Sequence, residues 1–314
     1  MPKQKTINKS FSFQGKGLHT GLNINLTFLP ANDNHGIKIK RIDLPEQPVM
    51  DAVADYVGQT QRGTILKNMD FQVSTIEHAM ASLYALGIDN CLLEVNAPEF
   101  PILDGSAKLY VDKILETGLQ EQLSDREYFV VKEKIEYTNP ETGSHIMVIP
   151  DENFSVNVQI GFKSSLLKNQ YASLGNLKEF VAEVSAARTF VFVREIKPLI
   201  KMNLIKGGDL KNAVVIYDEL ISQDSMDRLT EKLGQNHIDA SKLGYLSGEL
   251  KYENEPARHK LIDVIGDLAL VGRQIIGKIV AVHPGHKTNT ELAKLIRKEM
   301  LKENSEMRKS LIIN

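Results

Sequence analysis

One segment limits the possible folds of this chain more than any other: residues 256–271, PARHKLIDVIGDLALV. Leu261, Ile265 and Leu268 recur at helical spacing, and Pro256 suits the first turn of a helix. The pattern therefore predicts a helix that is apolar over most of its surface. Such a helix has to be buried among other elements of the fold.

Three polar side chains interrupt this apolar pattern. His259, Asp263 and Asp267 follow one another at intervals of four residues, so they lie on one face of the helix. Buried carboxylates are costly unless they are paired, hydrogen-bonded or bound to a metal. An imidazole and a carboxylate one turn apart can hold one divalent ion from the same face. The helix therefore predicts a metal site whose remaining ligand comes from elsewhere in the chain.

The overall composition excludes several classes of function. The formal net charge is −2, so nothing global indicates a nucleic-acid partner or an anionic membrane surface. No run approaches the ~20 apolar residues of a membrane span, and the polar first ten residues lack the apolar core of a signal peptide. The one cysteine, Cys91, lies in an apolar run that predicts a buried strand. We expect a cytoplasmic protein without an integral membrane segment or a disulfide.

The order of predicted elements divides the chain into two parts, residues 1–124 and 125–298, followed by a charged tail or linker at 299–314 with a helical pattern. Each part is expected to contain strands, a helix, a strand and a helix, with an extra strand after the second helix of the second part. Residues 222–255 are polar without clear periodicity and predict a surface insertion. The predicted strands are 24–29, 36–41, 91–95, 128–137, 145–149, 154–162, 213–217 and 277–282, and the predicted helices are 75–86, 106–116, 177–187, 256–271 and one from 289.

Glu77 and His78 stand at the start of the first predicted helix. His78 is a candidate third metal ligand, because a catalytic zinc takes three protein ligands and keeps a position for water. Glu77 would then be placed to take a proton from that water. The alternative is a capping box formed by residues 74–77, in which Glu77 only closes the start of the helix. The residues alone favour the cap.

Two further groups are candidates for proton transfer and oxyanion binding. His286 follows a predicted strand and a glycine turn, where it could protonate a leaving group, with Asp267 as the partner that keeps its imidazole charged. The alternative is that His283 and His286 are exposed loop histidines. The Thr189 hydroxyl could bond to a developing oxyanion, although a single threonine indicates little.

Two other features have a chemical and a plain interpretation. Lys260, beside His259, could contact an anionic group or be an ordinary surface lysine. The apolar run from Phe192 to Ile205 is typical of a core, and a groove for a long-chain ligand is the sharper alternative. Composition alone favours the plain interpretation of both features.

Several separated motifs occur in an order that resembles one known family, the UDP-3-O-acyl-N-acetylglucosamine deacetylases of lipid A biosynthesis. The resemblance covers roughly residues 4 to 300, and it reverses the preference for the plain interpretations given above. The motifs are GLHTG at 17–21, VSTIEH at 73–78, LGIDN at 86–90, EVNAPE at 94–99, PILDGSA at 101–107, ARTF at 187–190, RHKLIDVIGD at 258–267, and Gly285-His286 followed by Asn289.

The resemblance implies an α+β fold of two domains with similar topology, each a mainly antiparallel sheet with two helices, and with the helices packed between the two sheets. It implies one zinc per chain, with Fe²⁺ as an alternative in the cell, and a UDP-3-O-(3-hydroxyacyl)-N-acetylglucosamine substrate that loses acetate. It also implies that the native protein can continue into a fused 3-hydroxyacyl-carrier-protein dehydratase.

The resemblance further assigns roles to individual residues. The implied metal ligands are His78, His259 and Asp263. The implied catalytic residues are Glu77 as base, His286 as acid with its partner Asp267, and Thr189 as oxyanion donor. The implied substrate contacts are Lys260 near the diphosphate, Phe190 near the sugar, Phe162 at the uridine, and the run from Phe192 to about Val215 as a hydrophobic passage for the acyl chain.

Two alternatives stay open beside this reading. Two histidines and a carboxylate also describe a non-haem iron site. A non-catalytic lipid- or nucleotide-binding module could keep the same fold, although the intact Glu77, His286 and Asp267 argue against it.

Overall fold

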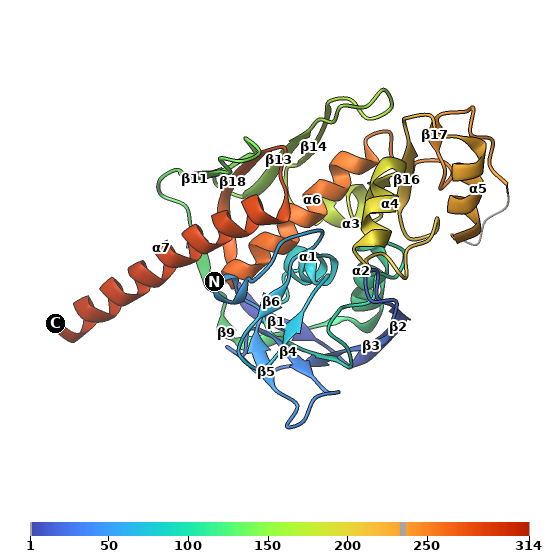
Figure 1. The fold of residues 1–314 in the computed structure, drawn as a ribbon. Coiled ribbons are helices and arrows are strands. Elements are labelled where there is room, and N and C mark those ends of the chain that lie inside the picture. The colour runs from blue at the N-terminus through green and yellow to red at the C-terminus, as the bar shows by residue number, and fades with distance from the viewer. Residues whose placement is uncertain (1, 233–236, 314) are drawn as a thin grey trace.

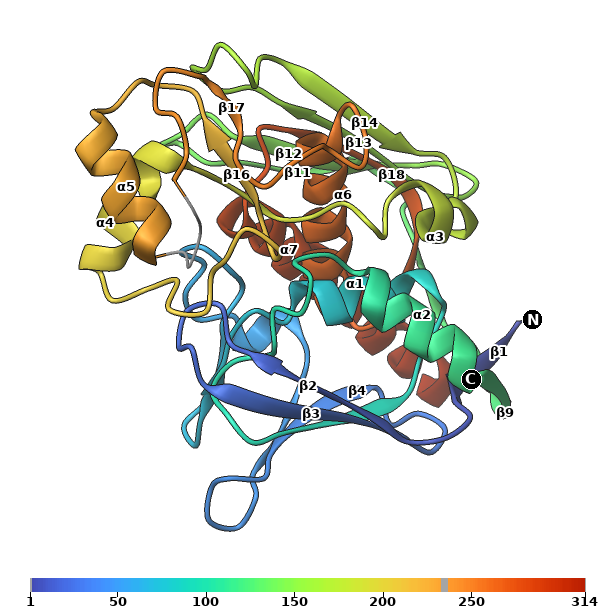
Figure 2. The same cartoon turned by 90° about the vertical axis from the view of Figure 1, so that its right-hand side faces the viewer.

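The structure, a computed structural model, describes residues 2–232 and 237–313. Two sheets form the outer layers of the molecule, and helices lie between them (Figures 1 and 2). The first sheet has the order β2 (Phe11–Lys16), β3 (Asn23–Pro30), β8 (Cys91–Val95), β4 (Ile37–Arg41), β5 (Val49–Asp51). The second has the order β11 (Ile135–Thr138), β12 (His145–Ile149), β18 (Gln274–Val282), β13 (Phe154–Ile160), β14 (Gln170–Leu174), and β10 (Tyr128–Val130) also pairs with β18.

The two sheets have the same connectivity. In each, the third strand of the order pairs antiparallel on one side and parallel on the other, and the two outer pairs are antiparallel. The strands form because apolar residues alternate with polar ones; in β13, for example, every second residue from Phe154 to Ile160 is buried. Strands that face helices on one side and solvent on the other show this alternation.

Each sheet contributes two helices to the middle layer. The helices α1 (Glu77–Ala85) and α6 (Glu255–Leu268) precede β8 and β18, and α2 (Lys108–Thr117) and α7 (His286–Ile313) follow those strands. The predicted α+β class, with helices packed between two sheets of similar topology, is confirmed. The strand predicted after the helix at 256–271 is confirmed as β18, and the elements of the second half without a counterpart in the first come before α6.

Both halves carry an insert at the equivalent point. It follows the edge strand β5 or β14 and ends where the helix α1 or α6 begins. The first insert (residues 52–76) contains η1 (Ala54–Tyr56), β6 (Leu66–Lys67) and β7 (Gln72–Val73). The second insert (residues 175–254) contains η2 (Leu177–Glu179), α3 (Phe180–Glu183), β15 (Phe190–Phe192), α4 (Val193–Lys201), β16 (Val214–Tyr217), α5 (Gln223–Lys232) and β17 (Gly244–Tyr245). Most of the second insert projects beyond the layered body (Figure 1).

Several predicted elements were only partly right. The helix predicted at 177–187 ends at Glu183, because the chain then turns and the Ser185 hydroxyl bonds back to the carbonyl of Val181 at 2.6 Å. The strand predicted at 128–137 is divided between β10 and β11, which pair with different neighbours. Within residues 222–255, predicted as a surface insertion, the helix α5 packs its buried Met226 into a small separate core. The buried Cys91 in β8 matches the prediction.

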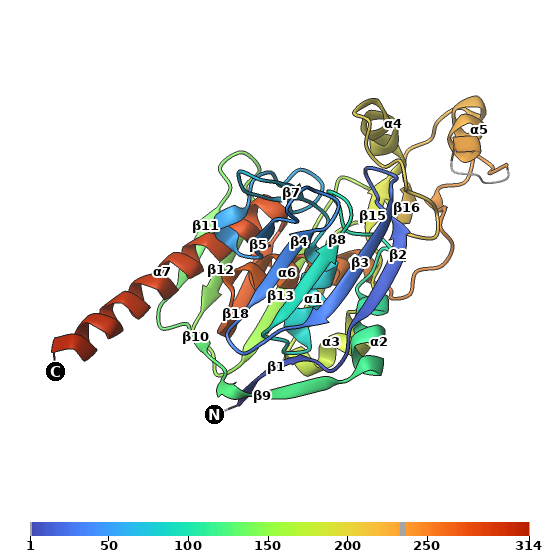
Figure 3. The same ribbon diagram turned by 90° about the horizontal axis from the view of Figure 1, so that it is seen from below.

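Two further strands form a small sheet of their own, and the last helix extends beyond the body. β1 (Lys3–Ile7) pairs with β9 (Leu119–Asp125), which leads into the second half. The last helix, α7, starts three residues before the predicted position and continues without a break through the segment predicted as a charged tail, so that its end extends away from the body (Figure 3). Among the described helices, none is both long and apolar enough to cross a membrane. The domain limits at 124 and 298 stay a prediction.

A close approach of α1 and α6 fixes the centre of the molecule. A methyl group added at Gly266 would lie 2.2 Å from the carbonyl oxygen of Glu77, so only glycine allows the two helices to come this near. The contact joins the first turn of α1 to the last turn of α6. It therefore brings the Glu77-His78 motif against the polar face of the long apolar helix.

Candidate active site

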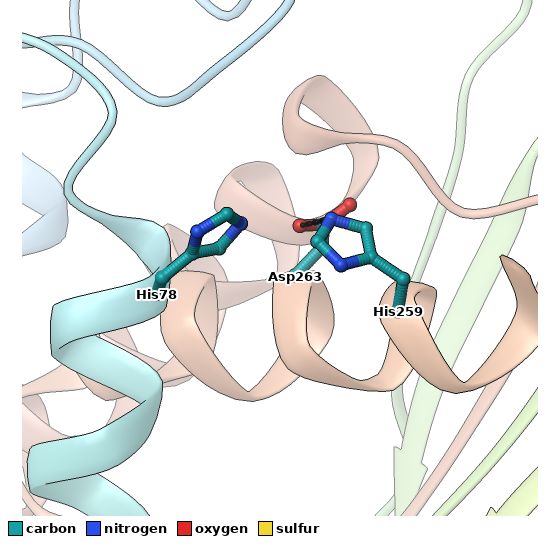
Figure 4. A group of neighbouring side chains, drawn as sticks. All are labelled: His78, His259 and Asp263. Carbon is teal, nitrogen blue, oxygen red and sulfur yellow. Dashed lines mark ion pairs between the residues drawn. The ribbon is translucent and has the colours of Figure 1, made fainter. Parts of the chain in front are cut away.

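Three side chains from α1 and α6 converge on one point between the sheets. His78 comes from the first turn of α1, and His259 and Asp263 come from successive turns of α6 (Figure 4). Their ligand atoms all lie within 4.8 Å of one another, and all three residues are buried. His259 Nε2 and Asp263 Oδ1 are 3.4 Å apart. Two imidazoles and one carboxylate at this spacing can hold a divalent metal ion.

The surroundings put these three groups in the protonation states that metal binding requires. Burial lowers the pKa of His78 to about 3 and also lowers that of His259, so both imidazoles are neutral near pH 7. His259 Nδ1 lies 3.1 Å from the carbonyl oxygen of Ala187, which accepts its hydrogen and leaves Nε2 free as a ligand. Burial alone would raise the pKa of Asp263, but Lys260, with Nζ 2.8 Å from Oδ2, and the nearby histidines outweigh it, so the pKa lies well below its usual range.

Glu77 does not cap its helix. The residue at the cap position, Ile76, makes no side-chain hydrogen bond, and the Ser74 and Thr75 hydroxyls instead bond to the Pro98 carbonyl and to Glu99. The capping-box interpretation of residues 74–77 was therefore wrong. The Glu77 carboxylate is 5% exposed, and burial raises its pKa to about 7. A carboxylate with this pKa can accept a proton near neutral pH.

His286 begins α7 and faces Glu77 across the site. Its Nε2 is 3.9 Å from Glu77 Oε1, and its Nδ1 is 3.0 Å from Asp267 Oδ2. Asp267, fully buried on α6, also accepts a hydrogen bond of 2.9 Å from the Asn289 amide. Burial opposes the charged imidazole, but Asp267, Asp263 and Glu77 together outweigh it and raise the pKa of His286 to about 9. The exposed-loop alternative describes His283 but not His286, whose side chain is 11% exposed.

The second insert brings Thr189 beside this cluster. The Thr189 backbone donates to the carbonyl of Gly105 and accepts from Val214, each at 2.7 Å. The preceding Arg188 is fixed by Glu255 in the first turn of α6, with Arg188 Nε 2.8 Å from Glu255 Oε1. These contacts fix the segment that follows Ala187, whose carbonyl contacts the candidate metal ligand His259. Thr189 and Phe190 line a pocket that continues along the apolar side chains Ile196, Leu199 and Ile205.

The predicted aromatic residues form one cluster beside the site. The ring centroids of Phe162 and Phe190 are 5.7 Å apart, and those of Phe162 and Phe192 are 5.2 Å apart. Phe162 is 38% exposed, whereas Phe192 is 2% exposed and supports the other two rings from beneath. The Lys260 ammonium lies 5.7 Å from the Phe190 ring centroid. A ligand can therefore reach Phe162 directly but not Phe192.

One residue beside Asp267 and His286 was given no role from the sequence. Thr64 of the first insert is fully buried, and its hydroxyl donates to Asp267 Oδ1 and lies 3.2 Å from His286 Nδ1. Its backbone N–H also points to Glu77 Oε2 at 3.4 Å. A single threonine in an irregular segment gives no periodicity; the resemblance drew attention to residues 60–64, which line the site in some relatives, but it gave Thr64 no role.

Comparison with known proteins places this chain in a family. The family model described as "LpxC: UDP-3-O-acyl N-acetylglycosamine deacetylase" matches residues 4–232 and 234–298. A protein of Porphyromonas gingivalis named "Bifunctional enzyme LpxC/FabZ" is 55% identical over 97% of this chain and 66% of its own length. The protein of that name from Bacteroides thetaiotaomicron is 56% identical over 96% of this chain and 65% of its own length.

A third relative has a simpler name. A Myxococcus xanthus protein named "UDP-3-O-acyl-N-acetylglucosamine deacetylase" is 34% identical over 95% of this chain and 86% of its own length. The chain spans less than two thirds of the length of the two bifunctional relatives. The match of the family model over nearly the whole chain nevertheless settles its kinship. This chain belongs to the LpxC family of UDP-3-O-acyl N-acetylglucosamine deacetylases.

Proposed function

We propose that the chain hydrolyses the acetamide of UDP-3-O-(3-hydroxyacyl)-N-acetylglucosamine and releases acetate and the free amine. The observation that carries this proposal is the pair formed by Glu77 and His286, which flank the three candidate metal ligands with Oε1 and Nε2 3.9 Å apart. A base and an acid together beside one metal position suit the hydrolysis of an amide, which needs both proton removal from water and proton delivery to nitrogen.

The proposed metal is zinc, and His78, His259 and Asp263 would hold it. The donor set fits, because both imidazoles are neutral, the carboxylate is ionised, and the Ala187 carbonyl fixes one ring. When bound, zinc lowers the pKa of a coordinated water and polarises a carbonyl as a Lewis acid. The same ligands would accept Fe²⁺. The two metals are compared by adding each back to chelator-stripped protein.

The chain's own residues move the protons. Glu77 accepts a proton from the attacking water as the water oxygen bonds to the acetyl carbon. The Thr189 hydroxyl donates to the carbonyl oxygen while negative charge develops there. His286, held protonated by Asp267, gives its Nε2 proton to the amide nitrogen as the carbon–nitrogen bond breaks. The products are acetate and the amino sugar, and Glu77 and His286 exchange their protons with solvent before the next turnover.

The pocket beside Thr189 supports the substrate assignment. Its apolar residues Ile196, Leu199 and Ile205 belong to the second insert and suit the 3-O-acyl chain. Phe162 offers an exposed ring on which a uracil can stack, and Lys260 offers a cation toward the diphosphate. The bifunctional relatives extend beyond the part that this chain matches, which supports the expected association of this activity with a second enzyme domain.

The proposal is tested by measuring acetate release from this substrate with chelator-stripped protein, to which zinc or Fe²⁺ is added back in steps. We expect activity to return as metal approaches one ion per chain. Replacing Glu77 by Gln should lower kcat by about 10²–10⁴-fold without loss of bound metal, as for removal of a general base. No acetate release at any metal level from folded protein would reject the proposal, and wild-type turnover by the Glu77→Gln variant would reject the role of Glu77.

A further inference from the structure

We propose that Thr64 is a positioning residue that holds the acid of the site, His286, in its working orientation through Asp267. The inference rests on the proposed function for its catalytic consequence, but its structural content can be tested without substrate. It starts from the way in which Asp267 is buried. This carboxylate is fully buried and lies one helical turn beyond the candidate metal ligand Asp263, yet no lysine or arginine is among its hydrogen-bond partners in the described residues.

Three donors from two separate segments satisfy the Asp267 carboxylate. Thr64 donates its hydroxyl hydrogen to Oδ1, while His286 Nδ1 and the Asn289 amide donate to Oδ2 at 3.0 Å and 2.9 Å. His286 and Asn289 belong to the first turn of α7, whereas Thr64 comes from the first insert. Removing the Thr64 hydroxyl would leave Oδ1 without this donor inside the protein. A buried oxygen in that condition draws its carboxylate toward other donors.

The Thr64 hydroxyl also contacts the imidazole itself. Its oxygen lies 3.2 Å from His286 Nδ1, and since its own hydrogen is used by Asp267, the oxygen is free to accept from Nδ1–H. The three groups therefore close a triangle in which Nδ1–H is shared between a carboxylate and a hydroxyl. This arrangement fixes both the ring plane and the tautomer of His286. The remaining nitrogen, Nε2, is then directed toward Glu77.

The geometry excludes a direct role of Thr64 in substrate binding. The residue is 0% exposed, so a substrate cannot reach its side chain. Its backbone N–H points to Glu77 Oε2 at 3.4 Å, which places the same short loop against both the base and the acid. A methyl group at the preceding Gly63 would lie 3.3 Å from Glu77 Oε1, so the loop runs close along this carboxylate. Thr64 thus acts through its neighbours.

The experiment compares Thr64→Val with Thr64→Ser. Valine keeps the volume and removes the hydroxyl, and serine keeps the hydroxyl. We expect Thr64→Val to lower kcat by about 10–100-fold, as for other residues that orient a catalytic group, and to leave KM within about twofold and the metal content unchanged. We expect Thr64→Ser to restore most of the activity. Thr6→Val is the matched control, because Thr6 is also buried and bonds a backbone carbonyl, that of Asn90, at 2.7 Å far from the site.

Two further measurements separate positioning from a general structural effect. If Thr64 acts through His286, then Thr64→Val has almost no additional effect on kcat in a His286→Ala background. In protein labelled with ¹⁵N-histidine, the wild type should show a slowly exchanging Nδ1–H resonance that is absent from His286→Ala and is lost or exchanges rapidly in Thr64→Val. This second measurement uses no substrate.

The possible outcomes distinguish this inference from the proposed function. Loss of the protected resonance in Thr64→Val, without acetate release by the wild type, would reject the proposed reaction and keep the positioning role. An unchanged resonance in Thr64→Val would overturn the inference even if the enzyme is active. Equal losses of kcat in the wild-type and His286→Ala backgrounds would likewise overturn it, because they would show that the threonine does not act through this histidine.

Discussion

Replacing Gly266 by alanine should damage the site even though it favours the helix in which the residue stands. In an exposed helix interior, alanine in place of glycine stabilises by about 1 kcal/mol. Here the new methyl group would lie 2.2 Å from the Glu77 carbonyl oxygen, and Cβ contacts shorter than 3.0 Å essentially do not occur in proteins. The first turn of α1 and the last turn of α6 must therefore separate by at least 0.8 Å to reach that limit. The obstacle is backbone, so rotation of a side chain cannot relieve it.

This separation acts directly on the chemistry. Glu77 and His78 move with α1, whereas His259 and Asp263 stay with α6, so the displacement opens the candidate metal site along the line that joins its ligands. Misplacing reacting groups by about 1 Å can cost about 10²-fold in rate. Overpacking of a core costs about 1–3 kcal/mol, which offsets or exceeds the gain in helix propensity.

The assay measures acetate release and zinc affinity of Gly266→Ala by competition with a chromophoric chelator. We expect activity to fall by about 10²-fold and zinc to bind more weakly, while the free energy of unfolding falls by no more than about 2 kcal/mol. Gly244→Ala is the control, because a methyl group at Gly244 meets nothing within 4 Å. A Gly266→Ala variant with wild-type affinity and rate would refute the argument that this contact sets the spacing of the ligands.

Three further predictions concern pH, a buried ion pair and the metal. Activity should rise as the pH passes about 7, where Glu77 ionises, and fall as it passes about 9, where His286 loses its proton; a pH–rate profile of His286→Ala should lack the fall at high pH. Glu255→Gln should cost about 3–5 kcal/mol in urea denaturation at neutral pH, because it leaves the Arg188 charge buried without its partner. Burial would raise the pKa of Glu255, but its bonds to Arg188 lower it below 4.5. The stabilisation by this ion pair is therefore present above pH 4.5 and is lost as the pH falls through the lowered pKa. The free energies of unfolding of the wild type and the variant should converge in acid. Chelation should lower the melting temperature and added zinc should restore it, since a ligand at 1,000 times its Kd stabilises the folded state by about 4 kcal/mol; an unchanged melting temperature would contradict metal binding by the three residues.

The sequence predicted the elements whose residues alternate or recur regularly. The long apolar helix around His259, most strands of both sheets and the two-part organisation follow from periodicity, which reflects burial. The strands β2, β5 and β14 were not predicted. The pattern of Glu77 misled for a physical reason. A glutamate three residues after a serine fits a capping box, but this carboxylate turns toward the other half of the chain, and only the packing of α1 against α6 determines that direction.

The site is predictable only where a motif accompanies the residue. His259 and Asp263 stood out because their spacing suited one ion, whereas His78 was assigned through the resemblance of its motif, and the structure brings the three together. Thr64 did not stand out, because its importance arises from contact with residues about 200 positions later in the chain. The extent of the second insert was also underestimated, since its short elements pack mainly on one another and leave weak periodicity.

The equivalent positions of the two inserts bear on how such a protein can diversify. Each insert leaves the frame after a sheet's last edge strand and returns at the start of a central helix, yet one comprises residues 52–76 and the other 175–254. The entropic cost of closing a loop grows slowly with its length, so descendants can lengthen or shorten either insert at little cost. Thr64 and the segment around Thr189 tie the inserts to the site. Ligand preference can thus drift through evolution on one part of the chain while the reaction is inherited unchanged on the other.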